Sequence, residues 1–110
     1  MLVRQVVTQP DPYAPFRLSQ GYRAGDLLFI SGQAAIDDEG RIVAPGDFDA
    51  QARQAFANLE RALKAGGSSL RNVVKVTIFL TDMSKFDKIV ELRGKYFSAP
   101  YPADTIVEVR

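Results

Sequence analysis

The side chains available for chemistry in this chain are carboxylates, hydroxyls, arginines and lysines, because the sequence contains neither histidine nor cysteine. Without cysteine there can be no disulfide, no thiolate nucleophile and no cysteine-ligated metal. Without histidine the chain lacks the commonest general base and the commonest ligand of transition metals. A zinc site made of carboxylates alone would be unusual. We therefore expect neither a metal nor a cofactor.

Two serine-containing segments can be compared with known catalytic motifs. Ser31 follows the apolar run at residues 27–30, but no histidine or obvious base lies beside it, which disfavours a serine hydrolase. Residues 65–68 read Ala-Gly-Gly-Ser and lack both the lysine and the preceding strand of a phosphate-binding loop. Both serines are better interpreted as residues of a turn and of a helix exit.

The charges of the chain are nearly balanced, with 14 basic and 13 acidic residues and a net charge of +1. Such a balance provides no strong field to attract nucleic acid or an anionic membrane. A strip of Arg53, Arg61, Lys64 and Arg71 is conceivable, but we expect no nucleic-acid partner. The N-terminus does not resemble a signal peptide, and no apolar run approaches the roughly 20 residues that span a bilayer. We therefore predict a cytoplasmic protein without a membrane partner.

The elements that must position these side chains alternate between strands and helices over the 110 residues, which suffice for one domain. Strands are expected at residues 2–7, 17–23, 27–30, 73–80 and 105–109, with a hairpin around the turn at residues 37–40. The 27–30 run is apolar throughout, which is typical of a strand buried on both faces. Asp47 or Asp49 can cap a helix that ends near Ala65, and Asp82 or Ser84 can cap a second that ends near Phe97.

This order predicts an α+β fold in which two helices pack on one face of a mixed sheet. The opposite sheet face is too apolar to be left in water. Because the chain is short, association with further copies is the simplest way to cover that face.

Four segments, taken in order, resemble those of the Rid family, which is also known as YjgF or endoribonuclease L-PSP. They are AGDLLFISGQ at residues 24–33, QARQAFANL at 51–59, NVVKVTIFLTDM at 72–83, and the YPA and VEV of residues 101–103 and 107–109, which frame the family's PAR(S/T)xVEV segment. The resemblance implies a chorismate-mutase-like fold and a homotrimer whose sheets form a barrel, with clefts for small ligands between subunits. It also implies hydrolysis of reactive 2-imino or 2-enamino acids to 2-keto acids and ammonia.

The chain departs from the family pattern where the substrate is held. The arginine that follows Pro-Ala in the family, and that binds the substrate carboxylate, is Asp104 here, so the sign of the charge is reversed. A pocket tyrosine is Phe16, within a segment that also carries the extra residues Arg17 and Leu18, and a pocket asparagine is Val90. The family's closing strand, with a glutamate credited with positioning water, would begin after Arg110. The domain at residues 1–110 is therefore expected to lack that strand.

Other family positions are retained: Ser31 and Gly32 match a pocket-lining turn, and Thr105 matches the hydroxyl residue after the arginine. We expect Asp104 and Thr105 to be catalytic and the substrate to contact Phe16, Ser31, Gly32, Val90 and Arg93. Asp104 has two interpretations, a solvated loop or cap residue and a residue that lines the cleft.

Arg93 lies three residues after Val90, on the same helix face. It is either a relocated clamp or the partner of Asp104 in an ion pair across an interface. The simpler alternative, an exposed helix arginine, is favoured by the sequence alone.

These residues lead to two hypotheses about function. The first is a Rid-type enamine or imine deaminase that hydrolyses a small C–N substrate whose charge differs from that of a simple 2-imino acid. The second is a non-catalytic trimer that binds a small metabolite and has a regulatory role. Imine hydrolysis needs neither histidine nor metal, because a cation, a positioned water and an enclosed pocket suffice.

Overall fold

The computed structural model describes residues 2–110, and the chain divides into two compact units, Met1–Ser69 and Leu70–Arg110. Two long helices and five strands are distributed between the units, and the strands pair both antiparallel and parallel. The predicted α+β fold with two helices is therefore confirmed. Hydrogen bonds gather the strands into one sheet in each unit, an antiparallel sheet of three strands and a parallel pair.

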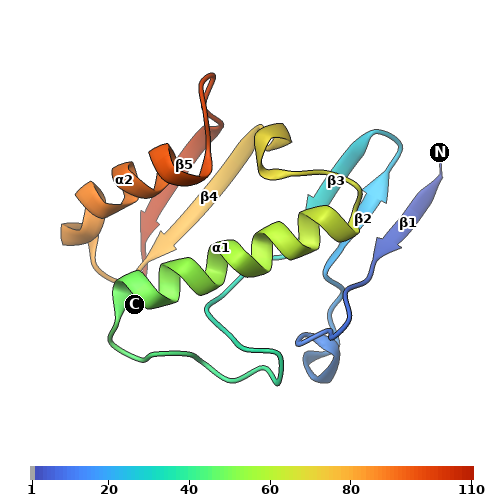
Figure 1. The fold of residues 1–110 in the computed structure, drawn as a ribbon, viewed down its shortest axis with the longest axis horizontal. Coiled ribbons are helices and arrows are strands. Elements are labelled where there is room, and N and C mark those ends of the chain that lie inside the picture. Colours follow the sequence, from blue (N-terminus) through green and yellow to red (C-terminus); the bar gives the residue numbers. More distant parts are fainter. Residues whose placement is uncertain (1) are drawn as a thin grey trace. The chain divides into compact units, whose positions relative to one another are not determined.

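The first unit contains the antiparallel sheet, in the order β1 (Val3–Val6), β2 (Gly21–Ala24) and β3 (Leu27–Ile30) (Figure 1). The predicted edge strand is thus β1. In the register of the sheet, Arg4 lies opposite Arg23, and Arg23 lies opposite Leu28. Directly opposed residues project to the same face, so these three side chains share one face of the sheet.

Helix α1 (Phe48–Ala65) packs against β3. Its N-cap is Asp47, the first of the two candidates from the sequence, and its side chain accepts a hydrogen bond from the Ala50 amide at 3.0 Å. The helix ends at two glycines. A β-carbon on Gly66 would lie 2.7 Å from the methyl groups of Leu28, and Gly67 has a φ of +81°. The first glycine therefore permits close contact with the sheet, and the second permits the left-handed turn that ends the helix.

The opposite face of the three-stranded sheet is apolar and exposed. Leu27 and Phe29 are 63% and 61% exposed, and Val3 and Tyr22 are also exposed. Only the alternate residues Leu28 and Ile30 of β3 are half-buried. The prediction that β3 is buried on both faces therefore does not hold within one chain, because one face has no cover there.

The loops of the first unit complete its core. The 3-10 helix η1 (Ala14–Phe16) precedes β2, and the predicted hairpin forms as an antiparallel bridge between Ile36 and Ile42. The carboxylate of Asp37 accepts hydrogen bonds from the amides of Glu39 and Arg41, both at 2.9 Å, which holds the turn.

In the second unit, β4 (Lys75–Leu80) and β5 (Ala103–Glu108) pair in parallel (Figure 1). They are preceded and connected by three helical segments, η2 (Leu70–Asn72), η3 (Met83–Lys85) and α2 (Phe86–Tyr96). Burial alternates along β4: Val76 and Ile78 are half-buried and Leu80 is buried. The predicted strands and helix are present with shifted ends. Strand β4 begins at Lys75 rather than residue 73, β5 spans Ala103–Glu108 rather than residues 105–109, and the turn η3 takes up the residues that were expected to begin the second helix. In residues 2–110, no helix is both long enough and apolar enough to cross a bilayer.

Candidate functional site

Three of the predicted site residues, Phe16, Ser31 and Gly32, lie in the first unit. Phe16 is 57% exposed, and its ring lies over the hairpin turn, 3.2 Å from where a β-carbon of Gly40 would be. The Ser31 hydroxyl donates to the carbonyl of Ser19. The Gly32 carbonyl accepts a hydrogen bond from the hydroxyl of Tyr13. The Ser31 hydroxyl is thus occupied in fixing the loop, which agrees with its interpretation as a turn residue.

A buried polar network that sequence reasoning missed holds this loop. Gln20 is 2% exposed and donates to the Thr8 hydroxyl at 3.0 Å. Its side-chain oxygen accepts from Gln33 at 3.2 Å, and the Thr8 hydroxyl donates to the carbonyl of Pro10 at 2.8 Å. The bonds of Gln20 to Thr8 and to Gln33 join residues that are 12 and 13 positions apart. The sequence therefore gave no local sign of this network, apart from the SGQ segment that contains Gln33. The network positions the turn that carries Ser31 and Gly32.

The other four predicted site residues lie in the second unit, and strand β5 separates two of them. Asp104 lies opposite Val76 of β4, and Thr105 lies opposite Thr77. Because successive residues of a strand project to opposite faces, Asp104 and Thr105 point in opposite directions. Asp104 is half-buried on the face shared with Val76 and Ile78, whereas Thr105 is exposed.

On the first of these faces, Asp104 forms an ion pair with Arg93 of α2. Nε of Arg93 lies 3.0 Å from Oδ2 of Asp104, with the two side chains 26% and 16% exposed. The guanidinium also lies over the ring of Phe86, 5.6 Å from its centre. The Arg93–Asp104 ion pair, which was considered as a contact across an interface between subunits, thus forms within one chain. Arg93 is a paired, half-buried side chain and not the exposed helix arginine that the sequence favoured.

The ion pair leaves one carboxylate oxygen unused. Oδ1 of Asp104 is buried and has no hydrogen-bond partner among the described residues. Buried polar atoms in native proteins are nearly always paired, and an unpaired acceptor is costly. This oxygen therefore lacks a donor, and because it is buried, a ligand or a water molecule can supply one only after the surrounding side chains move.

Thr105 has a different environment on the opposite face. The ammonium of Lys75 donates to the Thr105 hydroxyl at 3.1 Å and lies 3.5 Å from that of Thr77. Val90, the remaining predicted position, is 49% exposed on α2. The structure therefore joins Arg93 with Asp104 and separates Thr105 from them.

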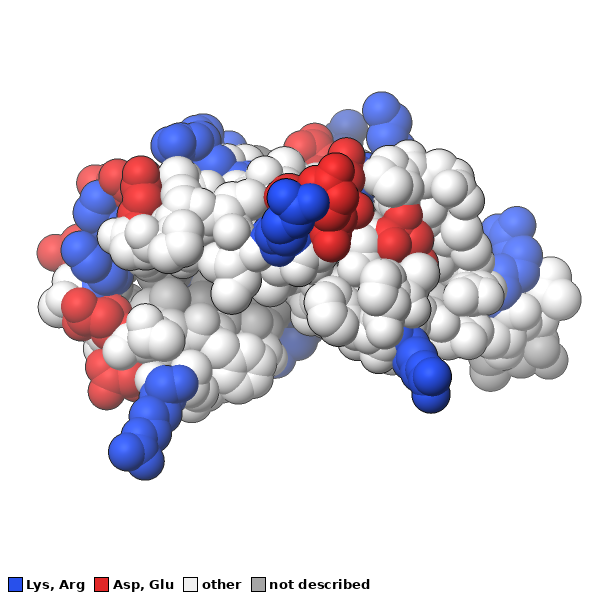
Figure 2. Space-filling view, turned by 90° about the horizontal axis from the view of Figure 1, so that it is seen from below, with Lys and Arg blue, Asp and Glu red and all other residues white. Residues whose placement is uncertain are grey.

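Charges on the rest of the molecule are mixed in sign. On the face presented in Figure 2, acidic and basic side chains of the described residues are interspersed and separated by uncharged surface. Within residues 2–110, no group of three or more acidic side chains is arranged to hold a metal ion.

Comparisons with known proteins place the chain in a family. The model of the family described as Endoribonuclease L-PSP matches residues 8–110. A RutC family protein of Pyrococcus horikoshii is 42% identical over 100 residues, which are 91% of this chain and 78% of that protein. The 2-iminobutanoate/2-iminopropanoate deaminase of Mus musculus is 35% identical over 109 residues, with 98% and 81% covered.

Solved structures agree with this assignment. The crystal structure of RidA from an Antarctic Psychrobacter species matches with a TM-score of 0.86 and 38% identity, and the match covers 96% of this chain and 85% of that one. Sequence and structure thus point to the same group of proteins as the four segments singled out above. The chain belongs to the Rid (YjgF) family, the group that the Endoribonuclease L-PSP model describes.

Proposed function

We propose that this chain is a Rid-family hydrolase that cleaves the C–N bond of a small imine or enamine whose charge differs from that of a simple 2-imino acid. The observation that carries the proposal is the Arg93–Asp104 ion pair, which replaces a lone cation by a neutral pair with one unpaired carboxylate oxygen. The similarity to the mouse 2-iminobutanoate/2-iminopropanoate deaminase supports the type of reaction.

The charge of the pair determines which substrate it favours. A lone arginine attracts a carboxylate, whereas a pair whose charges cancel does so weakly and presents an acceptor as well as donors. Once the side chains that bury it move aside, Oδ1 of Asp104 would accept a hydrogen bond from an N–H group, and the donors of Arg93 other than Nε would bind an oxygen. An uncharged imine or a cationic iminium therefore fits this site better than an anionic 2-imino acid.

Hydrolysis of an imine requires a group that holds the protonated nitrogen and a group that positions water, and this arrangement supplies the first. Hydrolysis begins when water adds to the imine carbon, and it ends when the carbinolamine releases ammonia. A carboxylate that accepts the N–H hydrogen bond would hold the protonated imine, which is the form that water attacks. Val90, which is exposed and apolar on the same helix as Arg93, would then form a wall rather than a polar contact.

We further propose that the working form is a homotrimer, with the clefts for the ligand between subunits. The support is the uncovered apolar surface on the sheet faces, which includes Leu27 and Phe29 in the first unit and Phe79 in the second. Large apolar side chains exposed on a sheet face are typical of association sites. Light scattering coupled to size exclusion tests the trimer, and Phe29→Asp is expected to dissociate it.

Ammonia release from imines generated in the assay tests the reaction. We expect slow release from 2-iminobutanoate and faster release from its uncharged amide counterpart. The double variant Arg93→Gln/Asp104→Arg restores a lone arginine and should reverse this preference. Asp87→Asn, which changes an exposed aspartate of α2 and raises the net charge by one as the double variant does, is the matched control and should leave the preference unchanged. Fast turnover of 2-iminobutanoate by the unaltered protein would contradict the proposal.

One observation favours the second candidate, a trimer that binds a metabolite without catalysis. The hydroxyl of Thr105 lies on the face opposite Asp104 and is bound by Lys75, so it does not assist at the ion pair. Binding of an uncharged amide or imine analogue that depends on Asp104, with no ammonia released from any imine, would favour this candidate over the enzyme.

A further inference from the structure

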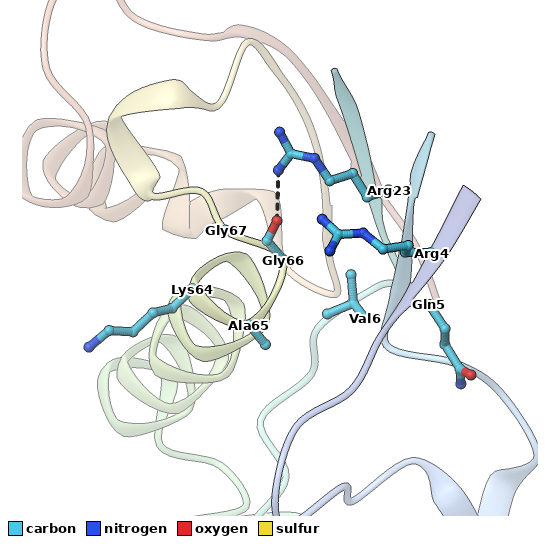
Figure 3. Close-up of a pocket in the computed structure, with 8 residues that line it drawn as sticks. All are labelled: Arg4, Gln5, Val6, Arg23, Lys64, Ala65, Gly66 and Gly67. Atoms are coloured by element: carbon cyan, nitrogen blue, oxygen red, sulfur yellow. Dashed lines mark hydrogen bonds between the residues drawn. The ribbon is translucent and has the colours of Figure 1, made fainter. Parts of the chain in front are cut away.

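A pocket of about 300 Å³ lies in the first unit, between the N-terminal strands and the end of helix α1 (Figure 3). It is lined by residues 4–6 of β1, Arg23 of β2 and residues 64–67. No predicted site residue takes part in it. Its lining contains three basic side chains and no acidic one, which is unusual in a chain with nearly equal numbers of both.

The register of the sheet brings two of these basic side chains together. Arg4 and Arg23 lie directly opposite one another on β1 and β2 and project to the same face. Figure 3 shows both guanidinium groups turned toward the end of α1, whereas the side chain of Lys64 extends away from them. The cationic part of the pocket is therefore the arginine pair. Like charges placed directly opposite each other in a sheet destabilise it.

The fold holds one of the two arginines in place. Nη1 of Arg23 donates to the carbonyl of Gly66 at 2.8 Å, and the side chain is half-buried (Figure 3). This bond exists because the glycine pair lets the end of α1 approach the sheet, where a β-carbon on Gly66 would collide with Leu28. A guanidinium that is already positioned loses less side-chain entropy when a ligand binds.

The other arginine, Arg4, has no partner among the described residues. Among residues 2–110, no hydrogen bond or ion pair involves the guanidinium of Arg4, which is exposed at the mouth of the pocket. In the described part of the chain, the groups that line the pocket with opposite polarity are the carbonyls at the C-terminal end of α1, whose partial negative charge is small beside two full positive charges. The pair therefore lacks its counter-charge.

We propose that this pocket binds the phosphate group of a small phosphorylated metabolite. Two guanidinium groups supply two positive charges, which match the charge of about −1.5 to −2 that a phosphate monoester carries at neutral pH. The planar donor forks of arginine fit phosphate oxygens in pairs. A carboxylate would neutralise only half of the charge. The volume lies at the lower end of the range for ligand pockets, so the ligand is small.

Thermal unfolding in inorganic phosphate, with ionic strength held constant by sodium chloride, tests the proposal. We expect the unfolding temperature to rise saturably with phosphate, because a ligand that binds only the folded state stabilises it. Acetate at the same ionic strength should give a markedly smaller rise. An equal response to acetate, or no response to phosphate, would refute the assignment.

Arg4→Gln is the decisive variant. Because Arg4 has no partner, this variant should fold and should unfold in chloride at the same temperature as the parent or a higher one. It should lose most of the response to phosphate. Arg53→Gln, which changes an exposed arginine in the middle of α1, is the matched control and should keep the full response. If Arg4→Gln responds to phosphate as the parent does, the pocket is not the site.

Arg23→Lys separates charge from geometry. Lysine keeps the positive charge but lacks the planar fork, so phosphate affinity should fall by about tenfold. As a second readout, the backbone amide signals of Gly66 and Gly67 should shift in NMR spectra when phosphate is added to the parent protein. Shifts confined to residues outside the pocket would count against the proposal. None of these measurements depends on the deaminase activity proposed above.

Discussion

Asn58 of α1 and Asp104 of β5 are polar side chains in the interiors of the two units, and they are satisfied to different degrees. Asn58 is 5% exposed, and its amide nitrogen donates to the carbonyls of Ala34 and Ile36 at 3.0 and 2.9 Å. Its side-chain oxygen accepts from Gln54 at 2.9 Å. Asp104 has one oxygen paired with Arg93 and another with no partner among the described residues.

The difference separates a structural role from a binding role. A polar group whose bonds are all made inside the protein stabilises one arrangement of the chain and has nothing left for a ligand. A group left half-satisfied costs stability, and such costs are typical of functional sites. The comparison therefore predicts that changes at Asn58 lower stability, whereas changes at Asp104 mainly alter ligand binding.

The largest effect is expected from Asn58→Ala. Removal of the asparagine side chain leaves the interior carbonyls of Ala34 and Ile36 without their donor, so the free energy of unfolding should fall by about 3 kcal/mol. Gln54→Ala removes only the partner of the asparagine oxygen and should cost about 1 kcal/mol. Urea unfolding of both variants measures the difference, and equal losses would mean that Asn58 is not the centre of the network.

Arg93→Ala should have the next largest effect. It leaves the half-buried carboxylate of Asp104 without its counter-ion, and because both side chains retain some exposure the loss should be about 1 to 2 kcal/mol. Lys95→Ala, which removes an exposed cation that lies over the ring of Tyr96, should cost less than about 0.5 kcal/mol. Unchanged binding of an uncharged amide or imine analogue by Arg93→Ala would exclude Arg93 from the site.

Asp104→Asn should change stability less than Arg93→Ala does. It weakens the bond to Arg93, but it also removes a charged oxygen that has no partner, so the two effects partly cancel within about 1 kcal/mol. Binding of the same analogue should fall clearly in this variant, as titration calorimetry would show. A large loss of stability with unchanged binding would make Asp104 a structural residue like Asn58.

Local patterns in the sequence predicted most of the fold. The cap at Asp47, the apolar periodicity of α1 and the alternation along β4 are set by neighbouring residues, so they can be recognised without a structure. The later start of α2 follows from the short 3-10 turn η3, which leaves no periodic signal.

The site was predictable only in part, because it depends on pairings between distant residues. The partnership of Arg93 with Asp104 was one of three interpretations of Arg93 and was not the favoured one, and its formation within one chain depends on how α2 lies against β5. The opposite directions of Asp104 and Thr105 follow from strand geometry and could have been inferred. The Arg4–Arg23 pair depends on the register of β1 and β2, which the sequence does not specify.

The smallest change in stability is expected at Asp82, an exposed carboxylate at the N-cap of η3 that accepts hydrogen bonds from Ser84. Hydrogen bonds from the hydroxyl and the amide of Ser84, the latter at 2.9 Å, hold the pKa of Asp82 below its ordinary value. A carboxyl whose pKa is lowered by folding stabilises the protein above its unfolded-state pKa, and this contribution disappears as the pH falls through the folded-state pKa.

Asp82→Asn tests this sign. The parent should be slightly more stable than the variant near neutral pH, and the difference should shrink as the pH falls below about 4, where an unfolded aspartate becomes protonated. Unfolding midpoints measured across this range give the profile. Asp26→Asn, at the exposed turn between β2 and β3, is the matched control. If the difference grows toward acid pH, the hydrogen bonds of Ser84 do not favour the ionised form. Asp82 would then not serve as a hydrogen-bonded counterpart to the half-satisfied carboxylate of Asp104.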